Sequence, residues 1–433
     1  MRLRLSGGRV IDPASGTDQP GDLLLEDGTV LAVDGGGGLP RADETVVDVG
    51  GAIVAPGFVD LHCHLREPGF EDKETLASGT RAAAAGGFTT LCALPDTEPT
   101  TDTGSDVESL LTQARRDAVV RVLAVGTVTK RRRGQELSEM ADMRAAGAVA
   151  FSDDGRPIAS ARVLRHALEY SLLTGKPVAD DAEDPDLAAG GVMHEGALAT
   201  QLGLRGVPRE AEEVAVARDL ALARLTGGRL HLSRLSTAGA VDLLRRAKAA
   251  GVRVTADVTP HHLVLTEQAV AGSAASHPYD TNARTAPPLR TRADAQALVA
   301  GLRDGTIDCV ATDHAPQRWI DKACEFDQAA PGISGLETAF GLLMRLVHAG
   351  TLPLPDLIAA LTSRPAAAWG LPYGTLRPGA PADVVVLDPD QLWVVDAERL
   401  VSMGKNTPLH GQTLRGAVLM TIAAGAVVYR NGL

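Results

Sequence analysis

The residues most able to do chemistry in this sequence are a pair of histidines and a set of later carboxylates. His62 and His64 stand two residues apart in an apolar segment, and on a β-strand such neighbours point to the same face. Asp154, Asp181 and Asp313 each lie at the end of a further apolar segment. Two imidazoles on one face, joined by carboxylates from other strands, are typical of a divalent metal site, and zinc suits this donor set best. A His-x-His pair alone would be weak evidence, since it also occurs by chance.

The elements that must position these residues alternate between short apolar strands and Ala-rich helices from residue 54 to residue 374. The predicted strands include 89–93, 120–125, 148–151, 178–181, 230–234, 252–258 and 309–313, and the predicted helices include 73–85, 210–226 and 238–250. About eight such units over roughly 300 residues favour a (β/α)8 barrel of the TIM type, in which active-site residues lie at the carboxyl ends of the strands. The alternative is an open doubly wound sheet, but the Gly-rich phosphate-binding fingerprint that usually accompanies it is missing.

The two ends of the chain have a different pattern. Residues 1–53 and 375–433 contain short strands broken by Gly, Pro and Asp, and the glycine run 35–38 is expected to be a flexible loop tip. Neither end has enough strands to enclose a core alone. We therefore predict that both termini pair into one small composite β-sandwich domain beside the barrel.

Composition restricts the class of protein. The chain has 433 residues, of which 45% are hydrophobic, and 42 basic against 54 acidic residues give a net charge of -12. This balance argues against nucleic acid or an anionic membrane as a partner. Four widely spaced cysteines form no disulfide framework, and neither a leader nor an 18-residue apolar run is seen, so a cytoplasmic location is expected. The basic run 130–133 is expected to be a solvated loop rather than a partner contact.

Around the two histidines, the segment FVDLHCHLREPG at 58–69 resembles the signature of type I dihydroorotases in the amidohydrolase superfamily. The likeness continues in order through nearly the whole chain, at 86–90, 94–97, 150–155, 259–263, 287–290, 311–316, 335–338 and 406–408. It implies a zinc-bearing, distorted (β/α)8 barrel with a small β-domain formed by the two termini.

The resemblance also implies roles for individual residues. His62, His64 and Asp313 would hold the first metal, with Asp154 as a nearby ligand. Asp313 would also take the proton of the attacking water and deliver it to the leaving amide nitrogen, and Arg66 would bind the substrate carboxylate bidentately. The other positions that the resemblance assigns to the substrate pocket are Asp96, Gln317, Pro331 and Gly332.

Five positions depart from the family pattern. Asp181 and Arg234 stand where histidines would hold a second metal, Asp96 and Ala286 replace substrate-binding asparagines, and Gln317 replaces a histidine. We expect Asp181 and Arg234 to form an ion pair in place of the second metal, so that one zinc ion is favoured over two. In the alternative, Asp181 remains a weak metal ligand and Arg234 turns to solvent. His231, three residues before Arg234, would point to the opposite face of the strand, so it could not simply take the place of the missing metal histidine.

Three functions fit these observations. The first is a zinc-dependent cyclic amide hydrolase that interconverts dihydroorotate and N-carbamoyl-aspartate in pyrimidine biosynthesis, with a small anionic cyclic amide as substrate. The second is a catalytically impaired homologue with a structural role alongside aspartate carbamoyltransferase; the expected assembly is a homodimer or a complex with that enzyme. The third is an amidohydrolase for another cyclic ureide. The retained first-metal residues favour an enzyme, whereas the altered second-metal and substrate positions favour reduced or changed activity.

Overall fold

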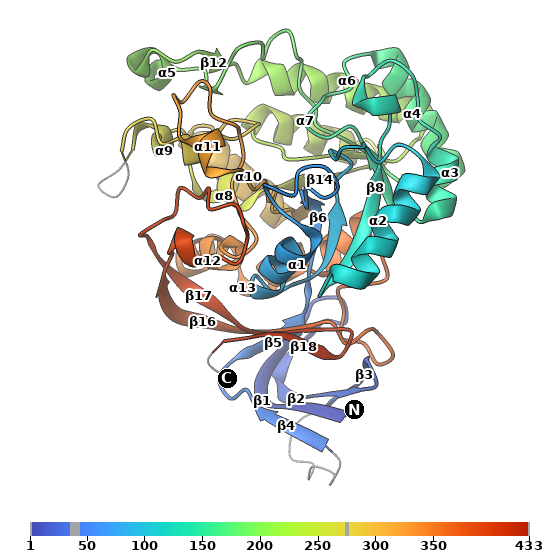
Figure 1. Cartoon of the computed structure of the whole chain (residues 1–433), viewed down its shortest axis with the longest axis vertical. Helices are drawn as coiled ribbons and strands as arrows, with labels where there is room; N and C mark the ends of the chain where they lie inside the picture. Colours follow the sequence, from blue (N-terminus) through green and yellow to red (C-terminus); the bar gives the residue numbers. More distant parts are fainter. Residues whose placement is uncertain (1, 35–43, 273–276, 432–433) are drawn as a thin grey trace.

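Eight parallel strands form the larger part of the molecule, which a computed structural model describes over residues 2–34, 44–272 and 277–431. Each strand pairs in parallel with the next one along the chain. The strands are β6 (Phe58–Cys63), β7 (Phe88–Ala93), β8 (Arg121–Gly126), β9 (Ala150–Ser152), β10 (Val178–Asp180), β13 (Leu230–Leu232), β14 (Val254–Val258) and β15 (Cys309–Val310). The predicted barrel is confirmed, and Figure 1 shows it above the strands of the two termini.

The ring is closed by contacts just beyond the ends of its first and last strands. Cys63 and His314 form a parallel bridge, and the backbone N–H of His64 donates to the carbonyl of His314 at 2.9 Å. The carboxylate of Asp60 accepts the backbone N–H of Thr312 at 2.9 Å and also binds the Thr312 hydroxyl. The strand predicted over 309–313 is therefore shorter than expected, because bonds from the Asp60 side chain replace its last ladder positions.

Helices cover the outside of the barrel and begin at recognisable caps. Thr75 caps α1 (Leu76–Ala85) in a capping box with Ser78, so this helix begins three residues later than predicted. The predicted helices over 210–226 and 238–250 are confirmed as α6 (Glu210–Thr226) and α7 (Ala238–Ala249). The remaining helices of the first half are α2 (Gly104–Asp117), α3 (Met140–Ala146), α4 (Ala161–Thr174) and α5 (Ala197–Leu202).

The second half of the chain adds shorter helices and connections. Its helices are α8 (Pro260–Val264), α9 (Gln268–Ala271), α10 (Arg292–Asp304), α11 (Trp319–Lys322), α12 (Ala339–His348), α13 (Leu354–Leu361) and α14 (Ser363–Trp369). Three 3-10 segments are η1 (Lys130–Arg132), η2 (Thr281–Ala283) and η3 (Ala397–Arg399), and β11 (Met193–His194) pairs with β12 (Gly206–Val207). Among the described residues, no helix is long and apolar enough to cross a membrane.

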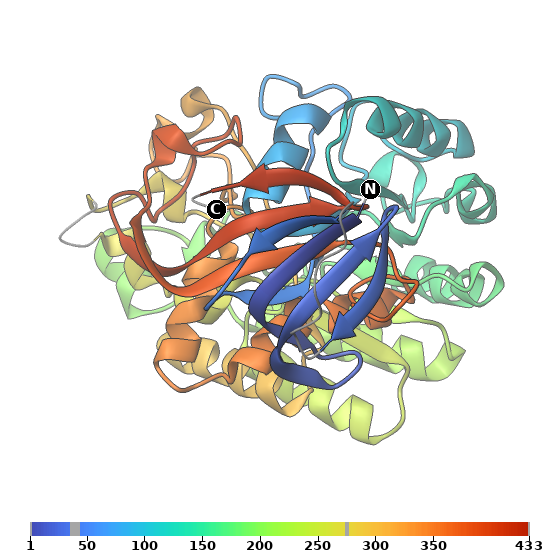
Figure 2. The same ribbon diagram turned by 90° about the horizontal axis from the view of Figure 1, so that it is seen from below.

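Both ends of the chain contribute to a second, mixed sheet of eight strands. The N-terminal strands are β1 (Arg2–Asp12), β2 (Thr17–Glu26), β3 (Thr29–Asp34), β4 (Glu44–Asp48) and β5 (Ile53–Pro56), and the C-terminal strands are β16 (Val384–Val394), β17 (Thr413–Ala423) and β18 (Ala426–Arg430). The two ends join where β5 pairs antiparallel with β16, and Figure 2 shows their strands side by side. Buried Leu, Val and Ile side chains from both ends share one core. The β-domain predicted from both termini is thus confirmed, whereas the predicted loop at 35–38 lies outside the described residues.

Candidate active site

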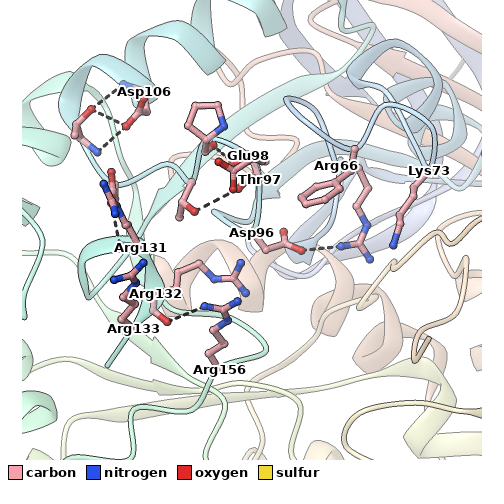
Figure 3. Close-up of a pocket in the computed structure, with 15 residues that line it drawn as sticks. Arg66, Lys73, Asp96, Thr97, Glu98, Asp106, Arg131, Arg132, Arg133 and Arg156 are labelled. Carbon is pink, nitrogen blue, oxygen red and sulfur yellow. Dashed lines mark hydrogen bonds and ion pairs between the residues drawn. The ribbon is translucent and has the colours of Figure 1, made fainter. Parts of the chain in front are cut away.

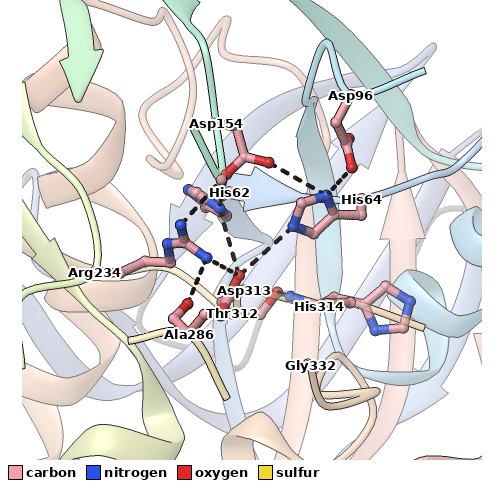
Figure 4. A network of polar contacts seen from close by, with 12 residues as sticks. His62, His64, Asp96, Asp154, Arg234, Ala286, Thr312, Asp313, His314 and Gly332 are labelled. Carbon is pink, nitrogen blue, oxygen red and sulfur yellow. Dashed lines mark hydrogen bonds and ion pairs between the residues drawn. The ribbon is translucent and has the colours of Figure 1, made fainter. Parts of the chain in front are cut away.

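The predicted site residues converge at the carboxyl end of the barrel strands (Figure 4). His62 lies on β6 and His64 directly after it, while Asp154 and Asp181 follow β9 and β10. Asp313 follows β15 by three residues. The carboxyl ends of parallel strands meet at one rim of a barrel, so residues that are far apart in sequence come together there.

The first-metal residues present nitrogen and oxygen atoms to a common point. His62 Nε2 lies 3.0 Å from Asp154 Oδ1 and 3.5 Å from Asp313 Oδ1, and His64 Nε2 lies 3.7 Å from Asp313 Oδ1. Ligand atoms that each sit about 2 Å from one ion are separated by roughly 3–4 Å. His62 Nε2 and Asp154 Oδ1 are buried and have no hydrogen-bond partner. His62, His64 and Asp154 can therefore hold a divalent ion, and Asp313 lies close beside them.

Asp96 is tied to the metal residues rather than free in the pocket. Its Oδ2 atom lies 2.9 Å from His64 Nδ1 and accepts a 2.7 Å hydrogen bond from Arg66 Nη1. A carboxylate on the far nitrogen of a ligand histidine holds the ring in the tautomer and orientation that a metal needs. The extra negative charge at this position is thus neutralised by Arg66, and one guanidinium nitrogen of Arg66 is in turn already bound to Asp96.

Arg234 lies among the carboxylates of the site. Its Nη2 and Nε atoms bind Asp181 at 2.7 and 3.2 Å, and its Nη1 atom donates to Asp313 at 3.1 Å and to the carbonyl of Ala286 at 2.9 Å. Its Nη2 atom is also 3.6 Å from Asp154 Oδ1. The expected ion pair between Asp181 and Arg234 is therefore present, and the guanidinium reaches further, to two residues of the metal set.

Burial and charge act against each other on these groups. Burial opposes the charge on Arg234, but Asp181, Asp313 and Asp154 outweigh it and hold the pKa of its guanidinium well above the usual range. Burial likewise opposes ionisation of Asp313, yet Arg234 beside it holds the pKa of this carboxyl well below the usual value. The carboxylate that is predicted to move the proton is thus kept charged and in place.

The predicted substrate residues after β15 lie in a loop that side-chain hydrogen bonds hold in place. Gln317 donates from Nε2 to the carbonyl of Pro331 at 2.9 Å and accepts from Lys73 Nζ at 2.8 Å. Asn406 Nδ2 donates to the carbonyl of Gly332 at 2.9 Å. Gly332 has a φ of 124°, and a Cβ atom there would lie 2.6 Å from the side chain of Ala315, so only glycine fits this close approach.

Two residues near the site were not predicted to act there. The buried Nε2 atom of His261 lies 3.8 Å from Asp313 Oδ2 and has no hydrogen-bond partner. Its place in the Thr-Pro-His-His block, directly after β14, was the available signal. Lys73 contacts Gln317 across 244 residues of sequence, and nothing in its local sequence indicates this. His231 is bonded to Asp257 and Thr255 and packs against Trp369, so it does not replace Arg234.

Comparisons with known proteins agree with this geometry. The family model described as Dihydro-orotase-like matches residues 51–240, and the Amidohydrolase family model matches residues 200–429. A dihydroorotase of Syntrophus aciditrophicus is 47% identical and one of Anaeromyxobacter sp. is 50% identical, over 100% and 99% of this chain and 100% and 98% of theirs. The solved L-hydantoinase of Arthrobacter aurescens is similar with a TM-score of 0.87 and 26% identity, covering 100% of this chain and 96% of its own. The chain, with a barrel rim that carries the metal-site residues in order, belongs to the dihydroorotase family of amidohydrolases.

Proposed function

We propose that this protein is a zinc-dependent cyclic amide hydrolase that interconverts dihydroorotate and N-carbamoyl-aspartate in the cytoplasm, as a step of pyrimidine biosynthesis. The observation that carries the proposal is the pair of buried atoms His62 Nε2 and Asp154 Oδ1, which lie 3.0 Å apart and make no hydrogen bond, with His64 and Asp313 beside them. One zinc ion would be held by these four residues. When bound, zinc supplies hydroxide at neutral pH and polarises a carbonyl group.

The residues of the chain provide the proton transfer and the remaining positive charge. Asp313 accepts a proton from the attacking water, and it returns that proton to the ring nitrogen as the C–N bond breaks. Arg234 keeps Asp313 ionised, and its guanidinium takes the place of a second metal between Asp181, Asp154 and Asp313. Asp181 is therefore proposed to be the counter-ion of Arg234 and not a metal ligand.

Purified protein that has been loaded with zinc should convert dihydroorotate, and Asp313→Asn should lower kcat by several orders of magnitude, with zinc content unchanged or slightly reduced. Aspartate carbamoyltransferase should be added in a parallel assay. Activity that requires this partner would support a shared assembly, and size-exclusion chromatography would distinguish that assembly from a homodimer. Absence of turnover in both assays would refute dihydroorotate as the substrate and leave the structural role alongside aspartate carbamoyltransferase or a different cyclic ureide.

A second candidate substrate class is favoured by the contact between Asp96 and Arg66. Because Asp96 Oδ2 holds Arg66 Nη1 at 2.7 Å, a substrate carboxylate must compete for the guanidinium and approach a fixed negative charge. A neutral cyclic ureide such as hydantoin or dihydrouracil avoids both costs. Comparison of kcat/KM for dihydroorotate and for these neutral rings on one zinc-loaded preparation decides between the two classes.

A further inference from the structure

A cationic pocket opens beside the metal residues and extends beyond Arg66 and Asp96, the two substrate residues that it shares with the proposed reaction. It has a volume of about 790 Å³, and Arg66 and Asp96 are among the residues that line it. Six basic side chains line it, namely Arg66, Lys73, Arg131, Arg132, Arg133 and Arg156. Figure 3 shows Arg131, Arg132, Arg133 and Arg156 together on one side, with Arg66 and Lys73 on the other. In a chain with a net charge of -12, such a gathering of arginines is unexpected.

Four acidic residues line the same pocket, namely Asp96, Glu98, Asp102 and Asp106, and three of them are bound to other groups. Asp96 is bound to Arg66 and His64, Asp102 accepts the backbone N–H of Arg131 at 2.9 Å, and Asp106 caps α2 through Thr103. Within the described part of the chain, the guanidiniums of Arg131, Arg132, Arg133 and Arg156 form no ion pair with any carboxylate. Guanidiniums that lie together without a direct ion pair repel one another, and a bound anion reduces that repulsion.

The loop that carries three of these arginines is held in one conformation. Thr129 binds the buried carboxylate of Asp153 through both its backbone N–H, at 2.9 Å, and its hydroxyl. The N–H of Gly134 donates to Thr129 Oγ1 at 2.8 Å. Arg131 and Arg132 have φ angles of 54° and 55°, a left-handed conformation that costs free energy in an L-residue and is found where function or tight packing requires it.

The same loop contacts the metal residues. The Nε atom of Arg132 donates to the carbonyl of Asp153 at 3.0 Å, and its Nη2 atom binds the carbonyl of Asp154. Arg156, two residues after Asp154, donates to the carbonyl of Arg132 at 3.4 Å. The basic run 130–133 is therefore only partly the solvated loop that its composition indicated, because Arg132 is anchored next to a predicted metal ligand.

We propose that this pocket binds a small, multiply charged anion of the phosphate-ester class, such as a diphosphate. Guanidinium groups bind phosphate oxygens bidentately, and a loop that is already ordered loses little entropy when the anion arrives. Phe70 lines the same pocket, with Lys73 Nζ 6.0 Å from the centre of its ring, and gives the pocket an apolar side chain for an organic substituent of that ligand. An anion bound in this pocket would affect Asp154 through Arg132, which binds the carbonyl of Asp154.

The test is calorimetric titration of the zinc-loaded full chain with inorganic pyrophosphate at low and constant ionic strength. The double variant Arg131→Gln with Arg133→Gln removes two exposed guanidiniums whose side chains make no described hydrogen bond. Its matched control is Arg162→Gln with Arg303→Gln, which changes the net charge equally on α4 and α10. Each lost charge-assisted contact weakens binding about tenfold, so the test variant should bind about a hundredfold more weakly and the control within about twofold of the wild type.

Three results would overturn the proposal. Wild-type protein that binds no pyrophosphate has no such site. Equal heats in the wild type and both variants would identify zinc removal by pyrophosphate, since chelation does not depend on Arg131 or Arg133. Tighter binding of a poly-glutamate peptide than of pyrophosphate, lost in the test variant, would identify the surface as a contact for an acidic protein segment. None of these readouts depends on turnover of a cyclic amide, so the proposed function can fail independently.

Discussion

Removal of the Arg234 guanidinium is the perturbation that most directly tests how the site is built. The side chain is 7% exposed, and its partners Asp181 and Asp313 are 10% and 3% exposed. Arg234→Met deletes three hydrogen bonds and the 2.7 Å ion-pair contact, and it leaves Asp181 without its counter-charge beside Asp154 and Asp313. Breaking a buried ion pair from one side costs about 3–5 kcal/mol, so the free energy of unfolding should fall by that amount in metal-free protein.

The assay is urea denaturation of metal-free protein, repeated with excess zinc. Zinc binds only the folded state and should recover part of the loss. Arg245→Met serves as the matched control, because Arg245 pairs with Asp242 and Asp304 but is 42% exposed, and such surface pairs contribute at most about 1 kcal/mol.

The metal count gives the second arm of this test. Wild-type protein should hold one zinc per chain, and the double variant Asp181→His with Arg234→His should hold two, because two imidazoles then replace the ion pair. Measurement by plasma mass spectrometry decides the point. Two zinc ions in the wild type, or a loss for Arg234→Met no larger than that for Arg245→Met, would refute the idea that the guanidinium takes the place of a metal.

Three further predictions concern other parts of the molecule. Asp60→Ala removes the carboxylate that joins β6 to Thr312 where the barrel closes. The free energy of unfolding should fall by about 2–5 kcal/mol. A loss below about 1 kcal/mol in urea denaturation would show that the bonds between Asp60 and Thr312 are dispensable. Asp96→Asn frees Arg66, so it should lower the KM for dihydroorotate about tenfold and leave the KM for neutral ureides unchanged. Steady-state kinetics on both substrates measure this, and an equal change in both KM values would contradict it. Burial lowers the pKa of Lys322 to about 7, so the unfolded chain holds more protons than the folded protein between pH 7 and 10.5. The free energy of unfolding should therefore rise by up to a few kcal/mol across that range. Lys322→Met should remove this part of the dependence of stability on pH in thermal unfolding, and the same pH dependence in both proteins would contradict the prediction.

Much of the fold follows from short-range patterns. Alternating apolar strands and Ala-rich helices predict the barrel, because parallel strands joined by helices can bury their apolar faces in few other ways. Helices with clear start signals, such as α6 and α7, match their predicted bounds closely. The shorter last strand does not, because the bonds between Asp60 and Thr312 join positions 252 residues apart, and no local pattern encodes them.

For the site, the sequence by itself determined which residues meet. His62 and His64 share a face because a strand alternates, and Asp154, Asp181 and Asp313 join them because they end parallel strands of one barrel. What these side chains contact at that rim was decided only by tertiary structure. Arg66 could have been free, but Asp96 holds it at 2.7 Å, and Arg132 could have lain in solvent, but it binds the carbonyl of Asp153 at 3.0 Å. Strand order and alternation are set by backbone geometry over a few residues, whereas a charged side chain takes the partner that the packing of distant loops brings within about 3 Å.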